Sequence, residues 1–568
     1  MPLSDSHRRL LRVAGWAVLL FVVLFWRLGA ATFWDPDEAI YAEASREMAR
    51  SGDYGAAFYN GTPFFDKPVV FYWLQASAMN LVGHNEFGVR LVPALAALAI
   101  VGLTAWTASL LAGAEVATLA ALIMATSPPL FALARYAILD TLFTAVLFGA
   151  SSLVAVGIVR NRPGLQYPAY ALVGLAVLIK GPLGLALTGL TFLLAAAASP
   201  DARKRLFDLR FVIGLLLALV IAAPWFVYMY LRFRQAFVDG YFLNENIKLF
   251  ATSMYAKQPP WYFYIQIMAT SLLPWTPLVL GRLVDTVRGL LQKRQPDLAD
   301  VLLWSWTVAI MGFFSFSEFK LDHYVFPAAP ALAILCARAW ADVCAHPDDE
   351  AVQWSRWGAM LVGPLFLAAG LGVAGFMIVR LDLPTAALVA PLAIAAAGAI
   401  VTAAMNLRRG DARTAPAWIP GAMVVVYAMV LVFVLPMLEQ KKVVPEVAAW
   451  VASHAGPSDR VASFRLNRWR TAYRFYVDRP VEQLDDETLA QQYFAADSPF
   501  YCAMLQPEFA RFVQAGARLK VVYVREGMWA TSGRALWRKA EKPTRFLVVT
   551  NASSPLPEVS LKSGAGQP

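Results

Sequence analysis

The sequence predicts a mainly α-helical, polytopic membrane protein with a small α/β domain at its C-terminus. The 568 residues are 59% hydrophobic and only 15% charged, and the mean hydropathy is +0.53, whereas soluble domains carry about 25% charged residues. Apolar runs long enough to cross a bilayer recur along the chain. After about residue 436 these runs give way to short β-branched and aromatic segments, which are typical of strands.

About thirteen apolar runs have the length of a membrane-spanning helix, which is roughly 20 residues. They cover residues 11–31, 91–112, 115–133, 137–158, 167–180, 182–199, 209–231, 263–282, 299–317, 323–342, 357–379, 384–405 and 416–436. The first run follows the basic stretch HRRLLR and has no small-residue cleavage pattern, so we expect a retained span and not a cleaved signal peptide.

The loops between these runs differ in charge. One side of the membrane receives HRRLLR, VRNRPG, DARKR, GRLVDTVRGLLQKRQ and NLRRGDAR. The positive-inside rule places this side, with the N-terminus, in the cytoplasm. These loops also account for the net charge of +10 without a nucleic-acid partner. The long connections 32–90 and 232–262 and the C-terminal tail then lie on the outer face.

The tail divides the chain into a membrane domain, residues 1–436, and an outer domain, residues 437–568. RVASFRL, FYCAML, LKVVYV and RFLVVT have strand-like composition, and DDETLAQQYFA and PEFARFVQAGA are helix-like, so the tail is predicted to be α/β. It contains no recognisable catalytic constellation. Cys336, Cys344 and Cys502 have no metal-ligand spacing, so neither a disulfide framework nor a thiolate metal site is indicated.

The stretch WDPDEAIYAE, residues 34–43, places three acids directly after the first span. Asp35, Pro36 and Glu38 fit the cap, first position and third position of a helix start, which is a purely structural interpretation. Asp37 is not needed for that cap and is therefore the stronger candidate for chemistry. The helix is expected to end at Gly52.

This outer helix has an apolar face and a charged face, an arrangement that would suit a helix lying on the membrane surface. The apolar face is formed by Ile40, Tyr41, Ala44 and Met48. The charged side chains are Glu43, Arg46, Glu47 and Arg50.

Four further charged residues lie on the outer side of the predicted topology. Asp66 and Lys67, between Pro63 and Pro68 in a stiff corner, form either a solvated surface pair or part of a site. Asp140 lies at the end of a span, where an acid usually faces a protein interior or a wet cavity, although a structural role stays open. Lys180 either reaches the membrane interface or binds an anion.

The second outer loop mixes aromatic side chains with Glu245, Lys248 and Lys257. Aromatic residues are expected at a membrane interface, so a grip on a lipid phosphate by the nearby cations is only weakly indicated.

An enzyme working on the outer face has no cytosolic nucleotide pool, and GPLGLALTG lacks the Lys-Ser/Thr of a phosphate-binding loop. A transferred group would therefore arrive on a lipid phosphate. A carboxylate can activate an acceptor hydroxyl, and cations or a metal can take the charge of the leaving phosphate. The competing class is a transporter or lipid flippase, in which ionisable groups usually lie near the bilayer midplane.

Several ordered motifs resemble those of the aminoarabinose transferases of bacterial lipid A and of the wider protein O-mannosyltransferase-like group of GT-C glycosyltransferases. These are DPDEAIYAEASREMARSGDY, NGTPFFDKPVVFYWLQA, GHNEFGVRLVPAL, ARYAILDTLFTA, LIKGPLGLAL, APWFVYM, LLPWTPL and FFSFSEFKLDHYVFPAAPALAIL. The resemblance covers roughly residues 30–340. It implies a bacterial inner-membrane enzyme with thirteen spans, a periplasmic domain, and an inverting sugar transfer from a polyprenyl (undecaprenyl) phosphate.

The resemblance also implies roles for individual residues. Asp37 matches the catalytic acid of the first loop and Asp140 a second acid of the cavity. Lys67 matches a lysine that holds the carrier phosphate, and Tyr41 and Tyr324 match tyrosines lining that site. Together with the reasoning above, the candidate catalytic residues are Asp37, Asp140 and Glu38. The candidate phosphate-binding residues are Lys67, Tyr41, Lys248, Tyr324, Lys320 and Lys180.

Three positions depart from the family pattern. Ile40 replaces an Arg of the first outer helix, Asn246 replaces a metal-binding His, and Leu249, beside Lys248, replaces a phosphate-gripping Arg. Asp66 occupies the position of a metal-binding Glu. Asp66 and Asn246 would suit Mg²⁺ or Mn²⁺ better than Zn²⁺. The acceptor is expected to be lipid A or another envelope glycan, with protein O-glycosylation as the alternative.

Overall fold

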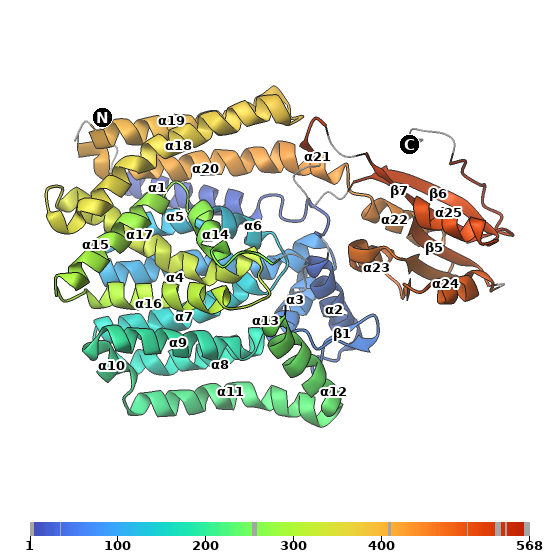
Figure 1. The fold of residues 1–568 in the computed structure, drawn as a ribbon, viewed down its shortest axis with the longest axis horizontal. Helices are drawn as coiled ribbons and strands as arrows, with labels where there is room; N and C mark the ends of the chain where they lie inside the picture. The colour runs from blue at the N-terminus through green and yellow to red at the C-terminus, as the bar shows by residue number, and fades with distance from the viewer. Residues whose placement is uncertain are drawn as a thin grey trace.

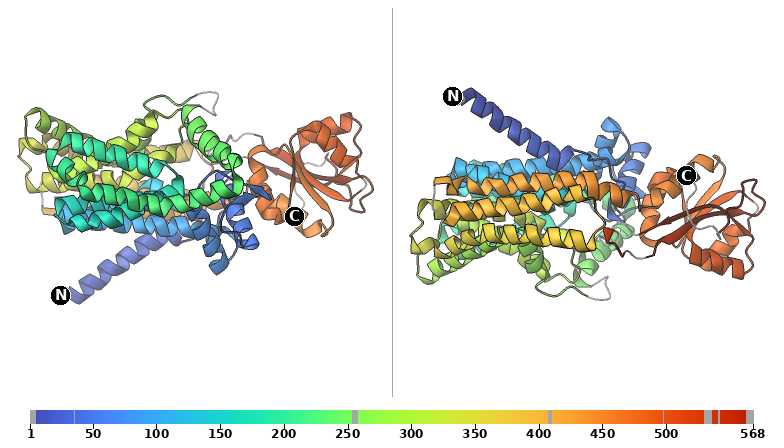
Figure 2. Two further views of the ribbon diagram at one scale, coloured as in Figure 1. Left: turned by 90° about the horizontal axis from the view of Figure 1, so that it is seen from below. Right: turned by 90° about the horizontal axis from the view of Figure 1, so that it is seen from above.

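The computed structural model describes residues 5–34, 36–252, 258–406, 410–496, 498–528, 536–539 and 542–561. Its helices form a long bundle, and a five-stranded sheet lies beyond one end of that bundle (Figure 1). Helix α1 leaves the bundle at an angle, as the two views of Figure 2 show. The mainly helical class predicted from the sequence is confirmed.

Helices make up nearly all of the bundle; the η labels mark short 3₁₀ and π segments. The elements from the N-terminus to the second outer loop are α1 (Asp5–Leu20), η1 (Phe21–Phe25), α2 (Asp37–Ser51), β1 (Phe58–Tyr59), β2 (Thr62–Pro63), α3 (Val70–Val82), α4 (Glu86–Ala112), α5 (Ala114–Ala125), α6 (Pro128–Ala134), α7 (Asp140–Val159), η2 (Pro163–Leu165), α8 (Gln166–Lys180), α9 (Leu183–Ala198), α10 (Pro200–Leu206), α11 (Leu209–Phe233), α12 (Gln235–Phe237), η3 (Val238–Lys248) and α13 (Leu249–Ala251). The remaining bundle elements are α14 (Phe263–Ser271), α15 (Thr276–Leu291), α16 (Leu298–Ser315), η4 (Asp322–Ala328), α17 (Ala329–Ala345), η5 (Glu350–Val352), α18 (Gln353–Arg380), η6 (Thr385–Leu388), α19 (Val389–Asn406), η7 (Gly410–Arg413), η8 (Ala415–Ala417), α20 (Trp418–Met429), η9 (Val430–Val434) and α21 (Leu435–Glu439).

Within the described residues, eight helices are long and apolar enough to cross a bilayer, and two bent helix pairs raise the number to ten. The bends are 57° between α5 and α6 and 118° between α14 and α15. Pro128 and Pro129 follow the first bend and Pro274 lies in the second; proline cannot continue the backbone hydrogen bonding of a helix. Each of the thirteen predicted runs coincides with one of the helices or helix pairs, although only the longer ones pass the length criterion.

The first outer loop folds into a compact unit of α2, the β1–β2 hairpin and α3. Helix α2 begins at Asp37 with Pro36 at its cap position and ends at Gly52, whose φ of 72° is the left-handed conformation that glycine adopts without strain. The end of this helix is as predicted. The capping interpretation of Asp35 lies outside the described residues.

The expectation that α2 lies on the membrane surface is wrong. Its charged face is buried against protein, since Glu43 is 0% and Arg46 3% exposed. Arg46 donates to the carbonyl of Phe475 in α23 (Arg470–Val477), so the charged side chains serve a protein interface.

The second outer loop folds over the first. Its π-helical segment η3 carries Tyr241, which packs above the end of α8. A side chain at Gly181 would lie 2.0 Å from the Tyr241 hydroxyl, so glycine is required for this approach, and its φ of 76° is likewise left-handed.

The C-terminal sheet has the strand order β4-β3-β5-β7-β6. The strands are β3 (Arg460–Phe464), β4 (Glu482–Leu484), β5 (Phe500–Leu505), β6 (Leu519–Gly527) and β7 (Thr544–Asn551). Strand β3 is parallel to β4 and β5, and β7 is antiparallel to β5 and β6. Besides α23, the helices of this part are α22 (Val444–His454), α24 (Glu487–Phe494) and α25 (Gln506–Gln514).

Candidate active site

Helix α2 carries Asp37 and, one turn later, Tyr41, so both side chains lie on one face of the helix. The Tyr41 hydroxyl donates to Asp66 Oδ2 at 2.7 Å. This hydrogen bond ties the first helical turn to the loop that carries Asp66 and Lys67. Burial raises the pKa of Tyr41 well above its usual value, and the nearby carboxylates act in the same direction.

Asp66, Lys67 and Glu245 form a compact charged triad. Lys67 Nζ lies 2.8 Å from Asp66 Oδ1 and 3.3 Å from Glu245 Oε2. Burial favours the neutral form of Asp66, but the charge of Lys67 and hydrogen bonds from its neighbours outweigh it and hold the Asp66 pKa at about 2. Burial and the hydrogen bond with Asp66 raise the pKa of Glu245 to about 8. Burial lowers the pKa of Lys67, but the two carboxylates reverse that effect and raise it overall. The triad therefore holds one proton between its two acids at neutral pH.

Asp140, Lys180 and His323 form a second group. Asp140 is the first residue of α7 and is 5% exposed. Lys180 Nζ, from the last residue of α8, lies 2.5 Å from Asp140 Oδ1. His323 Nε2 lies 3.8 Å from Asp140 Oδ2. The ammonium of Lys180 also lies 4.7 Å from the ring centroid of Tyr324, which is within range of a cation–π contact.

Asp37 stands between these two groups. Burial raises its pKa, the charge of His323 opposes that shift, and the charges of Asp66 and Asp140 add to it. Among the described residues its carboxylate makes no hydrogen bond or ion pair, in contrast to Asp66 and Asp140. Asp37 is thus a half-buried acid with raised basicity and an unoccupied carboxylate.

Asp66 and Asn246 do not fit a metal site. Both carboxylate oxygens of Asp66 accept hydrogen bonds, one from Tyr41 and one from Lys67, and an ammonium at 2.8 Å stands where a cation would have to lie. The Asn246 amide donates to the Tyr241 carbonyl of its own segment. In the part of the chain that the structure describes, no group of three or more His, Cys, Asp or Glu is suited to a metal ion, and we assign no step to one.

Glu38 is fully buried and lies in a network of its own. Its carboxylate pairs with Arg90 at 2.6 Å and 2.8 Å and accepts from the backbone N–H groups of Trp34 and Ala137 at 2.8 Å and 3.0 Å. Arg90 also donates to the carbonyls of Leu28, Ala31 and Thr32. These contacts anchor the start of α2 to the segment before α7. Glu38 therefore fixes the position of the helix start that carries Asp37 relative to the helix start that carries Asp140.

Two other candidates lie apart from the charged groups. Lys320 is buried and donates to the Ser317 carbonyl. Lys248 is exposed on η3, and its side chain makes no contact with the charged groups within the described residues.

His323 and Glu245 were not among the predicted site residues. His323 directly precedes Tyr324 in the motif KLDHYVFP, which was its only sequence signal. Glu245 precedes Asn246 in NENIKLF, and nothing in a local pattern indicates that it reaches Lys67, 178 residues earlier in the chain.

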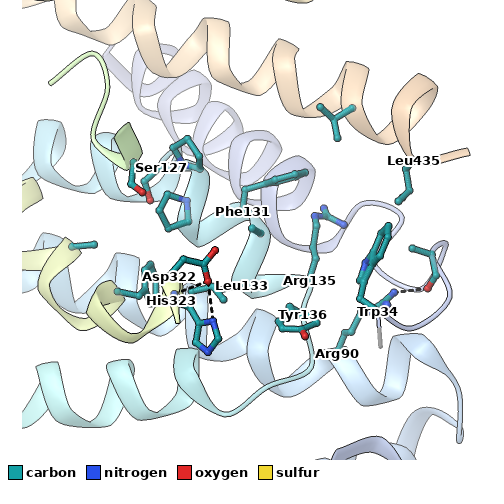
Figure 3. A pocket seen from close by; sticks show the side chains of 18 of the residues that line it. Trp34, Arg90, Ser127, Phe131, Leu133, Arg135, Tyr136, Asp322, His323 and Leu435 are labelled. Atoms are coloured by element: carbon teal, nitrogen blue, oxygen red, sulfur yellow. Dashed lines mark hydrogen bonds and ion pairs between the residues drawn. The ribbon is translucent and has the colours of Figure 1, made fainter. Parts of the chain in front are cut away.

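A cavity of about 590 Å³ is lined by His323, which also lies next to Asp140. Asp322 and His323 form part of its wall, together with Arg135 and Tyr136 (Figure 3). The His323 ring is hydrogen-bonded to Asp322 Oδ1 through Nδ1 at 3.2 Å. The imidazole of His323 therefore lies between the cavity and Asp140.

The chain shares sequence with several known proteins. The model of the family described as dolichyl-phosphate-mannose-protein mannosyltransferase matches residues 66–228. The undecaprenyl phosphate-alpha-4-amino-4-deoxy-L-arabinose arabinosyl transferase of Edwardsiella ictaluri is 33% identical over 57% of this chain and 59% of its own length. The same-named protein of Aeromonas salmonicida is 30% identical over 63% of this chain and 65% of its own length. The chain therefore spans about three fifths of the length of these curated relatives.

A solved structure matches nearly the whole chain. ArnT from Cupriavidus metallidurans, in a crystal structure with undecaprenyl phosphate, superposes with a TM-score of 0.74, covering 98% of this chain and 100% of that one at 21% identity. The chain has the ArnT fold. The resemblance to aminoarabinose transferases and GT-C glycosyltransferases that the motifs predicted is confirmed. The superposition with ArnT includes the C-terminal sheet, which lies beyond the motifs.

Proposed function

We propose that this chain is an integral membrane glycosyltransferase that moves a sugar from an undecaprenyl phosphate carrier to lipid A or another envelope glycan on the periplasmic face. Its named relatives are undecaprenyl phosphate aminoarabinosyl transferases, and the superposed ArnT crystal structure holds undecaprenyl phosphate. The observation that carries the proposal is the single unpaired acid, Asp37, held beside two lysine-centred groups.

The reaction requires a positive site for the leaving phosphate. Lys67, Lys180 and Tyr324 lie together, since Lys180 approaches the Tyr324 ring and the charge of Lys67 acts on the same tyrosine. We assign the carrier phosphate to this place. The proton shared by Asp66 and Glu245 keeps that pair at one negative charge. The two acids therefore balance the positive charge of Lys67 and add no excess negative charge that would repel the phosphate.

The transfer then follows from the placement of Asp37. An acceptor oxygen attacks the anomeric carbon, the bond between that carbon and the carrier phosphate oxygen breaks, and the phosphate leaves with both bonding electrons toward Lys67. For a hydroxyl acceptor, Asp37 takes the proton, and its raised pKa suits this task because a base works best near the ambient pH. A phosphate acceptor needs no base, and the Asp37 carboxylate then stabilises the positive charge that develops on the sugar.

We further propose that all thirteen helical runs cross the membrane, with the N-terminus in the cytoplasm and residues 437–568 as a periplasmic domain. Support comes from the bent pairs α5–α6 and α14–α15, and from the shorter apolar helices Leu10–Phe25 and Leu183–Ala198. The eight long apolar helices, these two bent pairs, these two shorter helices and α8 make up the thirteen runs. Labelling of single cysteines introduced at Gly164 and Ser554 by a membrane-impermeant reagent in intact spheroplasts tests the orientation; the proposal requires labelling at Ser554 alone.

The function is tested with purified protein in detergent, undecaprenyl phosphate-linked 4-amino-4-deoxy-L-arabinose and lipid A. The expected products are modified lipid A and free undecaprenyl phosphate, resolved by mass spectrometry, with no gradient or second compartment present. Failure of the protein to cleave this donor, or any other undecaprenyl phosphate sugar offered with lipid A, would refute the assignment.

A further inference from the structure

Residues 31–34 lead into α2, whose first residue is Asp37, and they belong to no helix or strand. Buried backbone polar groups outside such elements need partners from elsewhere in the chain. Glu439, the last residue of α21, and Lys442 supply several of these partners from more than 400 residues away. Figure 1 shows that α21 leads from the bundle toward the C-terminal sheet. The two side chains therefore stand at the junction of these two parts.

Glu439 holds Thr32 through two hydrogen bonds. Its Oε2 accepts from the Thr32 backbone N–H at 2.9 Å and from the Thr32 hydroxyl at 2.7 Å. The other carboxylate oxygen, Oε1, lies 2.8 Å from Lys442 Nζ. The side chains of Lys442 and Glu439 are only 10% and 19% exposed. Since water screens this ion pair little, it is stronger than a pair on the open surface.

Lys442 binds the same segment through its ammonium group. Its Nζ donates to the carbonyls of Thr32 at 2.8 Å and Phe33 at 3.3 Å. It also lies 3.5 Å from the ring centroid of Trp34, which is within range of a cation–π contact. Burial lowers the pKa of Lys442, and the charge of Glu439 opposes that shift. One ammonium thus contacts three consecutive residues of the segment.

The Thr32 carbonyl joins this ion pair to the buried pair of Glu38 and Arg90. Arg90 Nη2 donates to that carbonyl at 3.1 Å, while Lys442 donates to it at 2.8 Å. One pair comes from α2 and α4, and the other comes from the end of the bundle. The start of α2 is therefore fixed by two ion pairs that share one backbone group.

The position of Asp37 depends on this backbone. Its carboxylate makes no hydrogen bond or ion pair among the described residues, whereas Asp140 is paired with Lys180 and Asp66 with Lys67. A shift of the segment before α2 would therefore move Asp37 relative to two groups that are held by partners of their own.

We propose that Glu439 and Lys442 are positioning residues for sugar transfer, which act through residues 31–34 on the place of Asp37. Within the described residues, neither side chain has a hydrogen bond or ion pair with Asp37 or with Lys67. Their part in transfer rests on the proposed function, whereas the anchoring of the segment does not. The pair also links the C-terminal part of the chain to the reactive acid.

The test compares full-length variants in detergent, with the donor and lipid A of the assay above. The variants are Lys442→Met, Glu439→Gln and the conservative Lys442→Arg. Lys520→Met is the matched control, because Lys520 also donates to a backbone carbonyl, that of Ser554 in the C-terminal part. The readouts are kcat, KM for the donor, the midpoint of thermal unfolding and deuterium uptake by residues 31–40.

We expect kcat of Lys442→Met to fall about 10- to 100-fold, because a misplacement of about 1 Å can cost about 10²-fold in rate. KM for the donor should stay unchanged, which is the pattern of an interaction that acts in the transition state. Deuterium uptake by residues 31–40 should rise. Glu439→Gln should have a smaller effect, since its amide oxygen still accepts from Thr32, and Lys442→Arg should recover most of the turnover. Lys520→Met should match the wild type in all four readouts.

An unchanged kcat in Lys442→Met, despite increased uptake, would overturn the proposal. A loss confined to KM would also overturn it, as would a kcat that falls only in proportion to the folded protein. If Lys442→Met does not fold, kcat and KM of Glu439→Gln and Lys442→Arg decide in the same way. A wild-type protein that transfers no sugar would refute the proposed function and the positioning role with it, and deuterium uptake alone would then decide whether the pair anchors the segment.

Discussion

Helix α2 carries charged side chains on two faces, and on only one of those faces does every charged side chain have an ion-pair partner among the described residues. Toward the C-terminal sheet, Glu43 and Arg46 pair with each other, and Glu43 Oε1 lies 3.0 Å from Arg474. Arg46 reaches Asp478 at 2.7 Å and stacks 4.1 Å above the ring of Phe475. Each charge on this face is compensated by a neighbour of opposite sign.

The other face, toward the bundle, leaves one acid without such a partner. Tyr41 and Lys67 donate hydrogen bonds to Asp66, whereas the Asp37 carboxylate accepts none within the described residues and has a raised pKa. Both faces hold charged groups that are at least partly buried, so burial of charge alone does not distinguish a structural network from a reactive one. What distinguishes them is the completeness of ion pairing, because a fully ion-paired network stabilises the fold and an unpaired charge keeps its affinity for a substrate.

The comparison predicts its largest effect at Asp37. Asp37→Asn should lower the rate of transfer to a hydroxyl-bearing acceptor by about 10²- to 10⁴-fold, because within the described residues this acid is free of partners and can take the proton. Since it has no partner to lose, the midpoint of thermal unfolding in detergent should stay unchanged. A variant with normal turnover would show that the unpaired acid is incidental.

The fully ion-paired face predicts the reverse outcome. Arg46→Met removes the partner of Glu43 in a buried ion pair, and breaking a buried pair costs about 3–5 kcal/mol. Thermal unfolding should therefore shift strongly downward, while turnover per folded molecule stays near that of the wild type. Loss of turnover in protein that remains fully folded would remove the distinction between the faces.

Lys67 tests whether the triad on the bundle side binds the donor. Lys67→Gln removes a charged hydrogen bond of about 1.5–3 kcal/mol, so KM for the undecaprenyl phosphate sugar should rise about 10- to 100-fold. Carrier binding, measured directly, should weaken in parallel. Lys441→Gln is the control: this lysine belongs to neither face of α2, so its replacement should leave KM unchanged.

Glu245 sets the pH dependence of donor binding. Its pKa is raised to about 8, so it is neutral at pH 7 and acquires a charge as the pH rises through about 8. That charge repels the donor phosphate, and donor affinity should fall above pH 8. A raised folded-state pKa also means that stability falls as the pH rises from the unfolded value to about 8. Glu245→Gln should flatten both profiles; retention of the alkaline fall would assign it to another group.

Arg50 provides the smallest expected effect. It pairs with Asp478 at 2.8 Å, the same acid that Arg46 contacts, but its side chain is 48% exposed. Exposed pairs contribute about 0–1 kcal/mol. Arg50→Met should shift thermal unfolding only slightly compared with Arg46→Met, and a shift of equal size would show that burial does not control this interface.

Much of the bundle follows from local composition, because crossing a bilayer requires a long apolar run and each such run is visible in the sequence. The end of α2 at Gly52 followed in the same way, whereas Pro36, predicted as the first helical residue, stands at the cap position. The surface position expected for α2 was wrong because amphipathicity reports that one face is apolar and does not report what covers the charged face. Here Arg474 and Asp478 cover it, more than 400 residues away.

The sequence alone determined that the chain belongs in a membrane, where its helices run, and that Asp37, Asp66, Lys67, Asp140 and Lys180 are the acids and cations to consider. These are properties of single residues and short runs. Only the tertiary structure decided that Lys67 contacts both Asp66 and Glu245, and that His323 stands between Asp140 and a cavity. It also decided that Asp37, unlike Asp66 and Asp140, has no ion pair or hydrogen bond within the described residues. Pairing depends on distances across the fold, and a side chain's pKa and its freedom to react are set by those distances and by burial.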